Sequence, residues 1–452
     1  MKKEYLKYIF LAIYYFICIT FIYIAFRLDT YPNYGFSYGI VTGNIPYKDF
    51  NQIVPLFSSF LYSILLIFNH SIIVYYFEQT ILLLLMSYLL FKILDEKAWI
   101  PIVLLFLPIV IPFAYVLFPG YNFILLLELI LLIYLNHFNK SDKLIGLVSG
   151  ITIITKHNIG IFILIVSILY VIKYKKKVLN RLLYGLLPIL VFFIILLLYG
   201  NYYEFIDLCI LGTSDFMKNL LIDKWKLSLV LISIVIMIIK YIKDKNKNIS
   251  YYYLLVYLLI IFPIIDEYHL ALYLMFYIVV YLYNSKLKIK NKRIPIISFI
   301  IINIFICSWI LLSNTHFNRI KIYSYNNYEI TFMEKKEKKN IDELNKYIKN
   351  KEYILFSDPN MVIFLRVINN DKLNKYIILF NGNLGSKGIK GVLKEIEKNN
   401  NTYYIVDTRI NCKGKKGCQY IEEVPKYVMK NYELVKEIDY YKIYYNKRKG
   451  EI

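Results

Sequence analysis

The acidic residue Asp29 is a candidate general base. It lies a few positions after an apolar stretch, residues 5–26, and so falls where the chain leaves an apolar layer. Partial removal of a carboxylate from water moves its pKa toward neutrality, which suits a group that must accept a proton. A second carboxylate, Asp49, directly follows Lys48. The alternative is that Asp29 only caps a helix or is solvated in a loop.

The composition indicates which elements must position these residues. The chain has 452 residues, 58% of them hydrophobic, and residues 1–313 contain many apolar runs close to the roughly 20 residues of a transmembrane helix. We therefore expect a polytopic α-helical membrane protein of the cell membrane. The formal net charge of +22 would suit a nucleic-acid partner in a soluble chain, but here basic loops in contact with membrane lipids explain it. No nucleic-acid partner is expected.

Three lysine-rich clusters predict the orientation of the chain. They lie at residues 173–181, 240–247 and 286–293, and the chain crosses the apolar layer twice between successive clusters. By the positive-inside rule all three lie in the cytoplasm. Residues 54–68 form an apolar run of only about 15 residues, short of a full span. Counting this run as a span would move the lysines outside, so we expect an in-plane helix that completes the first outer loop.

The resulting topology has about eleven spans, with the N-terminus in the cytoplasm and the C-terminal region outside. The segment before residue 27 lacks a small-residue cleavage site and is expected to be a retained first span. Residues 144–174 are expected to form a hairpin bent near residues 156–158. The other expected spans are residues 5–26, 71–93, 99–118, 121–138, 182–200, 227–242, 251–264, 268–283 and 294–313.

Residues 318–452 change character and predict a small extracytoplasmic α/β domain after a transmembrane domain of residues 1–317. Segments with helical periodicity alternate with short β-like runs. The expected helices are residues 340–350, 387–399 and 421–431, and the expected strands are residues 353–356, 376–380, 403–406, 434–438 and 441–445. No phosphate-binding glycine motif is found there, so we interpret the domain as accessory. Outside the cytoplasm, Cys412 and Cys418 could pair as a disulfide or remain free.

Three segments carry a family resemblance. The first combines Asp29, Gly43, the run Ile-Pro-Tyr-Lys-Asp-Phe at residues 45–50, and Pro55. It resembles the first-loop signature of the GT-C superfamily of polyprenyl-phosphate-sugar-dependent glycosyltransferases, which includes protein mannosyltransferases, aminoarabinose transferases and rhizobial lipopolysaccharide sugar transferases. Residues 146–160 are similar to the family's glycine-rich span, and residues 262–269 are similar to a segment that opens a late span.

The resemblance implies a GT-C-like fold and inverting transfer of a sugar from a polyprenyl-phosphate donor to an extracytoplasmic glycan, lipid or protein acceptor. It makes Asp29 the catalytic base. The departing lipid phosphate needs cations or hydrogen-bond donors. The candidates for binding the donor phosphate or substrate are Lys48, Asp49, Tyr121, Asn122, Lys156, His157, Asp266 and His269. Lys48 could instead snorkel to headgroups, and Lys156 with His157 could simply break a helical hairpin.

Two further questions stay open at this point. The chain departs from the family's commoner pattern at residues 119–122, which supply no acid, so no required metal or cofactor is predicted, with a divalent metal as the alternative. The rival class is a polytopic transporter or lipid-linked saccharide flippase. Transporters concentrate polar residues at the bilayer midplane, whereas these candidates gather at one interface. Glu78 and Glu128, inside apolar spans, are either functional or hydrogen-bonded between helices.

Overall fold

The computed structural model describes most of the chain. The described residues are 2–26, 30–94, 118–173, 178–212, 223–244, 247–262, 265–285, 320–325, 330–380, 382–399, 401–410 and 420–446. Several expectations lie outside them: the base Asp29, the cysteines Cys412 and Cys418, residues 99–117 and 294–313 of two spans, and the lysine cluster at residues 286–293.

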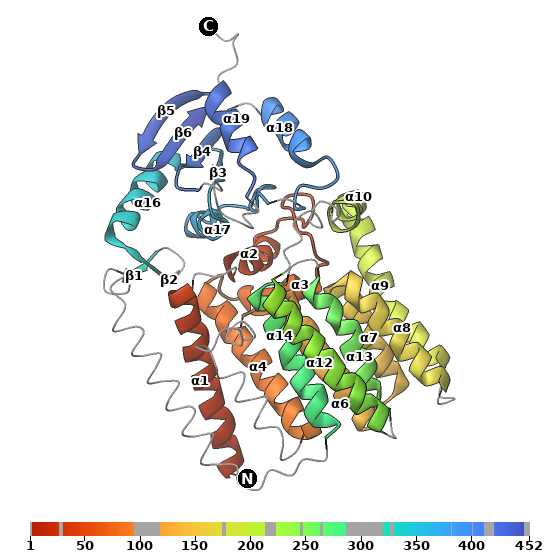
Figure 1. The fold of residues 1–452 in the computed structure, drawn as a ribbon. Coiled ribbons are helices and arrows are strands. Elements are labelled where there is room, and N and C mark those ends of the chain that lie inside the picture. Colours follow the sequence, from red (N-terminus) through yellow and green to blue (C-terminus); the bar gives the residue numbers. More distant parts are fainter. Residues whose placement is uncertain are drawn as a thin grey trace.

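The N-terminal two thirds form a bundle of helices, and a small mixed sheet with its own helices lies at one end of it (Figure 1). The helices are α1 (Lys2–Phe26), α2 (Thr30–Val41), α3 (Phe57–Leu66), α4 (Ile72–Leu94), α6 (Tyr121–His137), α7 (Asp142–Thr155), α8 (His157–Lys173), α9 (Val178–Tyr199), α10 (Tyr202–Ile206), the π-helical η3 (Asp207–Leu211), α12 (Lys224–Lys243), α13 (Ile249–Tyr257), the 3-10 helix η5 (Leu258–Ile261) and α14 (Glu267–Tyr283).

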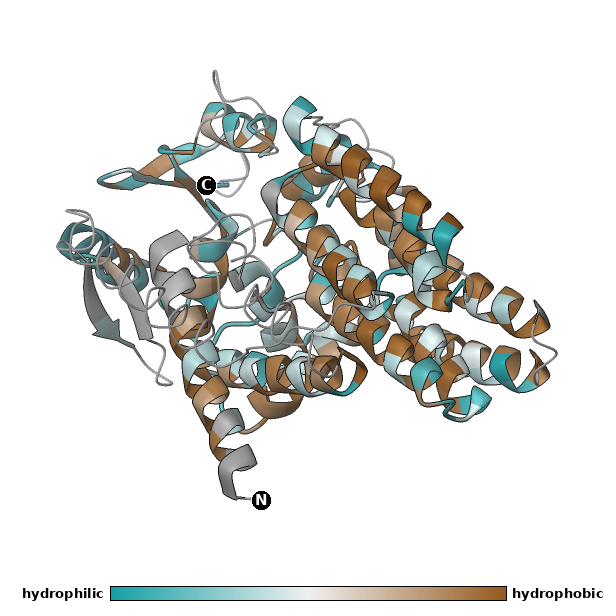
Figure 2. Cartoon of the chain, turned by 60° about the horizontal axis from the view of Figure 1, so that its bottom comes forward, coloured by the Kyte–Doolittle hydropathy of each residue, from teal (hydrophilic) through white to brown (hydrophobic). Residues whose placement is uncertain are grey.

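Three of the described helices, α4, α9 and α12, are long and apolar enough to cross a membrane. In the most apolar stretch of α9, only 22% of the residues are buried inside the protein, and the share in α12 is the same. Their leucine and isoleucine side chains therefore point outward, where they need an apolar surrounding. The bundle helices carry long hydrophobic stretches, with hydrophilic residues mainly toward their ends (Figure 2). These features support a helical membrane-associated protein, and the number of eleven spans stays a prediction.

Close backbone contact between α7 and α9 depends on glycine. A Cβ atom on Gly150 would lie 2.0 Å from the carbonyl oxygen of Gly185, and one on Gly146 would lie 2.4 Å from that of Arg181. Small residues four apart let two apolar helices approach in this way. Arg181 is buried and donates to the carboxylate of Asp142 at 2.6 Å. The glycine-rich run at residues 146–160 therefore has a packing role.

The hairpin predicted near residues 156–158 is confirmed. Helix α7 ends at Thr155, Lys156 has extended backbone angles, and α8 begins at His157. A Cβ atom on Gly160 would lie 2.4 Å from the backbone of α7, so only glycine allows the two helices to cross this closely. The break places the Lys156 side chain at the end of the hairpin.

The segment that the sequence predicts as the first outer loop contains the two short helices α2 and α3. Helix α3 has only 10 residues, which agrees with the expectation that this segment is too short to span a membrane. Helix α2 is buried on opposite sides: Tyr34 and Tyr38 lie on one side and Phe36 on the other, and all three are buried. Figure 1 shows the reason: α2 lies between the bundle and the C-terminal elements.

The C-terminal part contains two sheets. The elements are β1 (Ile320–Ser324), β2 (Ile330–Glu334), α16 (Lys335–Ile348), β3 (Tyr353–Phe356), α17 (Pro359–Ile368), α18 (Gly388–Lys398), β4 (Tyr403–Asp407), α19 (Glu423–Asn431), β5 (Glu433–Ile438) and β6 (Tyr441–Tyr445). β1 and β2 form an antiparallel hairpin, and the other strands form a sheet in the order β3-β4-β6-β5, with β3 and β4 parallel.

Four of the five predicted strands and all three predicted C-terminal helices are found, with ends shifted by a few residues. The strand predicted at residues 376–380 is wrong: this run forms turns, and only Phe380 makes a bridge, to Tyr420. Helix α17 and the β1–β2 hairpin were not predicted. The expectation of a small mixed α/β region is therefore supported.

Tight contacts join the C-terminal part to the first outer loop. Ile363 of α17 packs directly on Gly35 of α2. A Cβ atom on Gly35 would lie only 2.6 Å from the Ile363 side chain. Asn44 donates to the carbonyl of Leu373 and accepts from its amide, both at 3.2 Å. One continuous hydrophobic cluster includes residues of both parts. The C-terminal part thus covers the loop that follows Asp29.

Candidate functional site

The site is built where several helices begin at the same face of the bundle. Asn122 lies in the first turn of α6, Lys156 immediately precedes α8, and Asp266 caps α14. Helix N-termini carry a partial positive charge and unpaired amide groups, which favour an anion. The N-termini of α6, α8 and α14 therefore favour a negatively charged ligand at this end of the bundle.

Lys156 occupies the centre of this group. Its ammonium donates to Oδ1 of Asn122 at 2.9 Å and lies 5.3 Å from the centre of the Tyr121 ring. Burial lowers the pKa of Lys156 to about 8, and the negative charge of Asp266 opposes that change. The side chain can therefore supply a cation near neutral pH in a place from which water is largely excluded.

Asp266 holds His269 in a fixed orientation. Its Oδ1 accepts hydrogen bonds at 2.8 Å from both the backbone amide and the Nδ1 of His269. Burial raises the pKa of Asp266, but the hydrogen bonds and charge of His269, together with the charge of Lys226, outweigh burial and leave that pKa below its usual value. Asp266 is therefore ionised, and the Nε2 of His269 is available for a ligand.

Lys226 is a further basic residue at this face that the sequence did not single out. It lies in the first turn of α12, is buried, and pairs with Asp223 at 3.4 Å. Its charge acts on Asp266, which places it beside the same group. The signal in the sequence was a group of three charged residues, Asp223, Lys224 and Lys226, at the start of an apolar helix, and it does not distinguish Lys226 from its neighbours.

Asn33 connects α2 to the same group. A Cβ atom on Gly120, the residue before α6, would lie 3.3 Å from the Asn33 side chain. Asn33 is in the first turn of α2, which begins at Thr30. Asp29, the predicted base, immediately precedes Thr30 in the sequence but lies outside the described residues. The start of α2 therefore belongs to the face that holds Lys156.

The predicted residues divide into two groups. The structure brings together Tyr121, Asn122, Lys156, Asp266 and His269. His157 is adjacent to Lys156, and its Nδ1 has no hydrogen-bond partner in the described part of the chain. Thr155 of α7 donates a hydrogen bond to the buried carboxyl of Glu128 in α6 at 2.6 Å. Of the two alternatives for Glu128, a functional role or a hydrogen bond between helices, the structure shows the hydrogen bond.

Lys48 and Asp49 are not in contact with this group. Lys48 is exposed, and Oδ2 of Asp49 accepts from the amide of Ile45 at 2.7 Å within its own turn. The neighbouring Asn51 binds the C-terminal part through the carbonyls of Lys375 at 3.2 Å and Asn383 at 2.8 Å. This turn therefore anchors the loop, and binding of substrate by Lys48 and Asp49 stays a prediction.

No metal centre is visible among the described residues, where no group of three or more histidine, cysteine or acidic side chains could hold an ion. The expectation that no metal is required, with a divalent metal as the alternative, stays a prediction.

Fold and site together define a mostly helical protein with membrane-compatible helices and a basic, polar group of side chains at one end of its bundle. Searches among protein-family models, curated proteins and solved structures found no match for this chain.

Proposed function

We propose that the chain is a membrane glycosyltransferase of the GT-C type that uses a polyprenyl-phosphate-linked sugar at the outer face. The observation that carries this proposal is the meeting of Lys156, Lys226 and His269 at the starts of several helices. Two lysines and a histidine at the N-terminal ends of helices suit the phosphate of a lipid donor. The apolar outer surfaces of α9 and α12 suit a protein that receives its substrate from the bilayer.

In the proposed reaction Asp29 takes the proton of an acceptor hydroxyl. The acceptor oxygen then attacks the anomeric carbon of the sugar, the bond from that carbon to the phosphate oxygen breaks, and the configuration inverts. Lys156, Lys226 and His269 stabilise the charge that collects on the departing lipid phosphate. Asp266 orients His269 for this role. The acceptor is a glycan, lipid or protein outside the cytoplasm.

Replacing Asp29 with asparagine tests the proposal. The amide keeps the size of the side chain but cannot accept the proton, so transfer should fall by about 10²- to 10⁴-fold while donor binding persists. Wild type and Asp29→Asn are reconstituted side by side with radiolabelled lipid-phosphate sugars and cell-envelope acceptors. Equal transfer by the two proteins would remove Asp29 from the mechanism. Binding and translocation of the donor without any transfer by wild type would favour the flippase alternative.

The pH dependence of transfer offers a second test. Lys156 loses its proton near pH 8, because burial disfavours its charged form. The rate of transfer should therefore fall as the pH rises through about 8. The free energy of unfolding should instead increase between about pH 8 and 10.4, because in that range only the unfolded chain keeps the proton on Lys156. Rates and thermal unfolding are measured across pH 6.5–9.5. A variant with arginine at position 156 keeps its charge, so its remaining activity should not decline near pH 8.

A further inference from the structure

Helix α3 is polar on the side that packs against the protein and apolar on the side that is exposed. Its serines Ser58, Ser59 and Ser63 are all buried, at 3–4% exposure. Every exposed side chain in residues 57–68 is large and apolar, and these are Phe60, Ile64, Ile67 and Phe68, the last of them 84% exposed. A helix at a surface covered by water has the opposite arrangement, with its polar residues outward. The exposed face of α3 therefore needs an apolar surrounding.

The polar side of α3 is hydrogen-bonded inside the protein. The Oγ of Ser59 accepts from the Nε2 of Gln52 at 3.0 Å. Tyr62, on the same side of the helix, donates to the side chain of Gln79 in α4. Buried polar groups that have such partners do not depend on water. These bonds hold α3 by its polar side and keep its apolar side outward.

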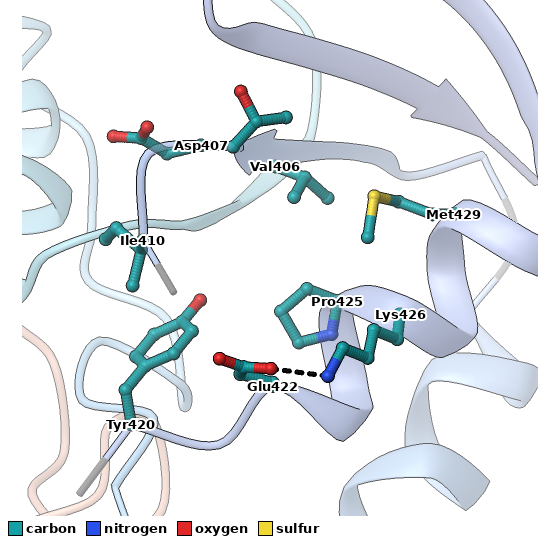
Figure 3. Close-up of a pocket in the computed structure, with 9 residues that line it drawn as sticks. Val406, Asp407, Ile410, Tyr420, Glu422, Pro425, Lys426 and Met429 are labelled. Atoms are coloured by element: carbon teal, nitrogen blue, oxygen red, sulfur yellow. Dashed lines mark hydrogen bonds and ion pairs between the residues drawn. The ribbon is translucent and has the colours of Figure 1, made fainter. Parts of the chain in front are cut away.

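Helix α19 in the C-terminal part has the arrangement that is typical of a helix in water. Val424 and Val428 are buried, whereas Lys426 and Lys430 are exposed. Figure 3 shows Lys426 at the start of this helix, where it forms an ion pair with Glu422. The comparison within one chain indicates that α3 and α19 lie in different surroundings.

The next helix, α4, packs against α3 and also has an exposed apolar stripe. Phe77, Ile81 and Leu85 are exposed at every fourth position of α4, which is one of the three described helices long and apolar enough to cross a membrane. Residues 54–69 contain no charged side chain, so this segment offers no charge that could pair with a protein partner. The hydrocarbon chains of a bilayer would cover the apolar surfaces of both helices.

We propose that α3, together with Ile67 and Phe68, is a membrane anchor that lies in the plane of the bilayer and inserts its exposed face among the hydrocarbon chains of the leaflet on the side of the C-terminal part. The sequence predicts an in-plane helix, but not which of its faces contacts lipid. Helix α3 also packs against α6 and α7, so the anchor holds the pair of Lys156 and Asn122 close to the level of the lipid headgroups. The anchor does not depend on the transfer reaction, and only its value for binding a lipid phosphate rests on the proposed function.

Spin-label accessibility on the full chain in bilayers of phosphatidylcholine and phosphatidylglycerol tests this proposal. A nitroxide is attached at Ile64→Cys or Ile67→Cys on the exposed face, and at Lys430→Cys of α19 as the control in water. Oxygen concentrates in hydrocarbon, whereas a nickel chelate stays in water. Oxygen should therefore relax the labels at positions 64 and 67 more strongly than the chelate does, at a depth of about 5–10 Å below the headgroups. The chelate should relax the label at position 430 more strongly.

The parent protein for these labels carries Cys307→Ser, Cys412→Ser and Cys418→Ser, while Cys18 and Cys209 are buried and do not react. Stronger relaxation by the nickel chelate at positions 64 and 67 would place this face in water and overturn the proposal. Weak relaxation by both reagents would show that protein covers the face, which would also overturn it. The measurement does not require transfer, so labels in hydrocarbon on an inactive protein would support the anchor and contradict only the proposed function.

Discussion

Replacing Lys156 with glutamine is expected to reduce transfer by about 10²- to 10³-fold, the effect of removing one preorganised group that stabilises charge in a transition state. Glutamine keeps a polar side chain next to Asn122 but removes the positive charge. The Lys156 ammonium donates to the side-chain oxygen of Asn122 at 2.9 Å, and the variant removes this charged donor. Initial rates with a radiolabelled polyprenyl-phosphate sugar in proteoliposomes measure the loss.

A matched control is available in α12. Lys224 is exposed, whereas Lys226, two residues later, is buried and acts on Asp266. Lys224→Gln should leave the rate unchanged, and Lys226→Gln should lower it, by less than Lys156→Gln because Lys226 also pairs with Asp223. Similar rates for all three variants would contradict the assignment of this group to the donor phosphate.

Replacing Gly150 with leucine is expected to have the largest effect on stability. A side chain there would meet the backbone of α9, since even a Cβ atom would lie 2.0 Å from the carbonyl oxygen of Gly185. Backbone atoms cannot rotate away as a side chain can, so the helices must separate at a cost of about 3 kcal/mol or more. The midpoint of thermal unfolding should then fall by about 3 °C or more.

Fluorescence-detected size exclusion after heating in detergent measures this change. Ser228→Leu adds a side chain of the same size on α12, where Ser228 is exposed, and should leave the midpoint nearly unchanged. If the two leucine variants unfolded at the same temperature, the contact between α7 and α9 would not contribute to stability as the structure indicates.

The sequence predicted those elements that depend on local pattern. The polar residues from Lys156 to Asn158 interrupt a long apolar run, and a break in the hairpin follows from that alone. The same holds for Asp266, whose position just before an apolar helix indicated the start of α14. The structure brings Tyr121, Asn122, Lys156, Asp266 and His269 near one another, and their role in binding a substrate stays a prediction.

Features that depend on distant partners could not be predicted in this way. Residues 376–380 have the composition of a strand, but they lack a neighbouring strand to pair with and form turns. Helix α17 reads as a short apolar run whose periodicity does not separate helix from strand. Lys226 approaches Asp266 only because α12 packs beside α14. The spacing of Lys48 and Asp49 in a family-like motif did not reveal that their turn anchors the C-terminal part.

The hydrogen bonds between Asn44 and Leu373 join residues that are 329 positions apart in the chain. A ribosome adds about 5–20 residues per second, so Asn44 waits roughly 15–65 s for its partner. During this interval the bundle can already be inserted while α2 lacks its cover. A nascent chain released before residue 373 would therefore leave the Asn44 side chain without this partner. The segment that contains α2 is the earliest part of the proposed site to be made and the last to be completed.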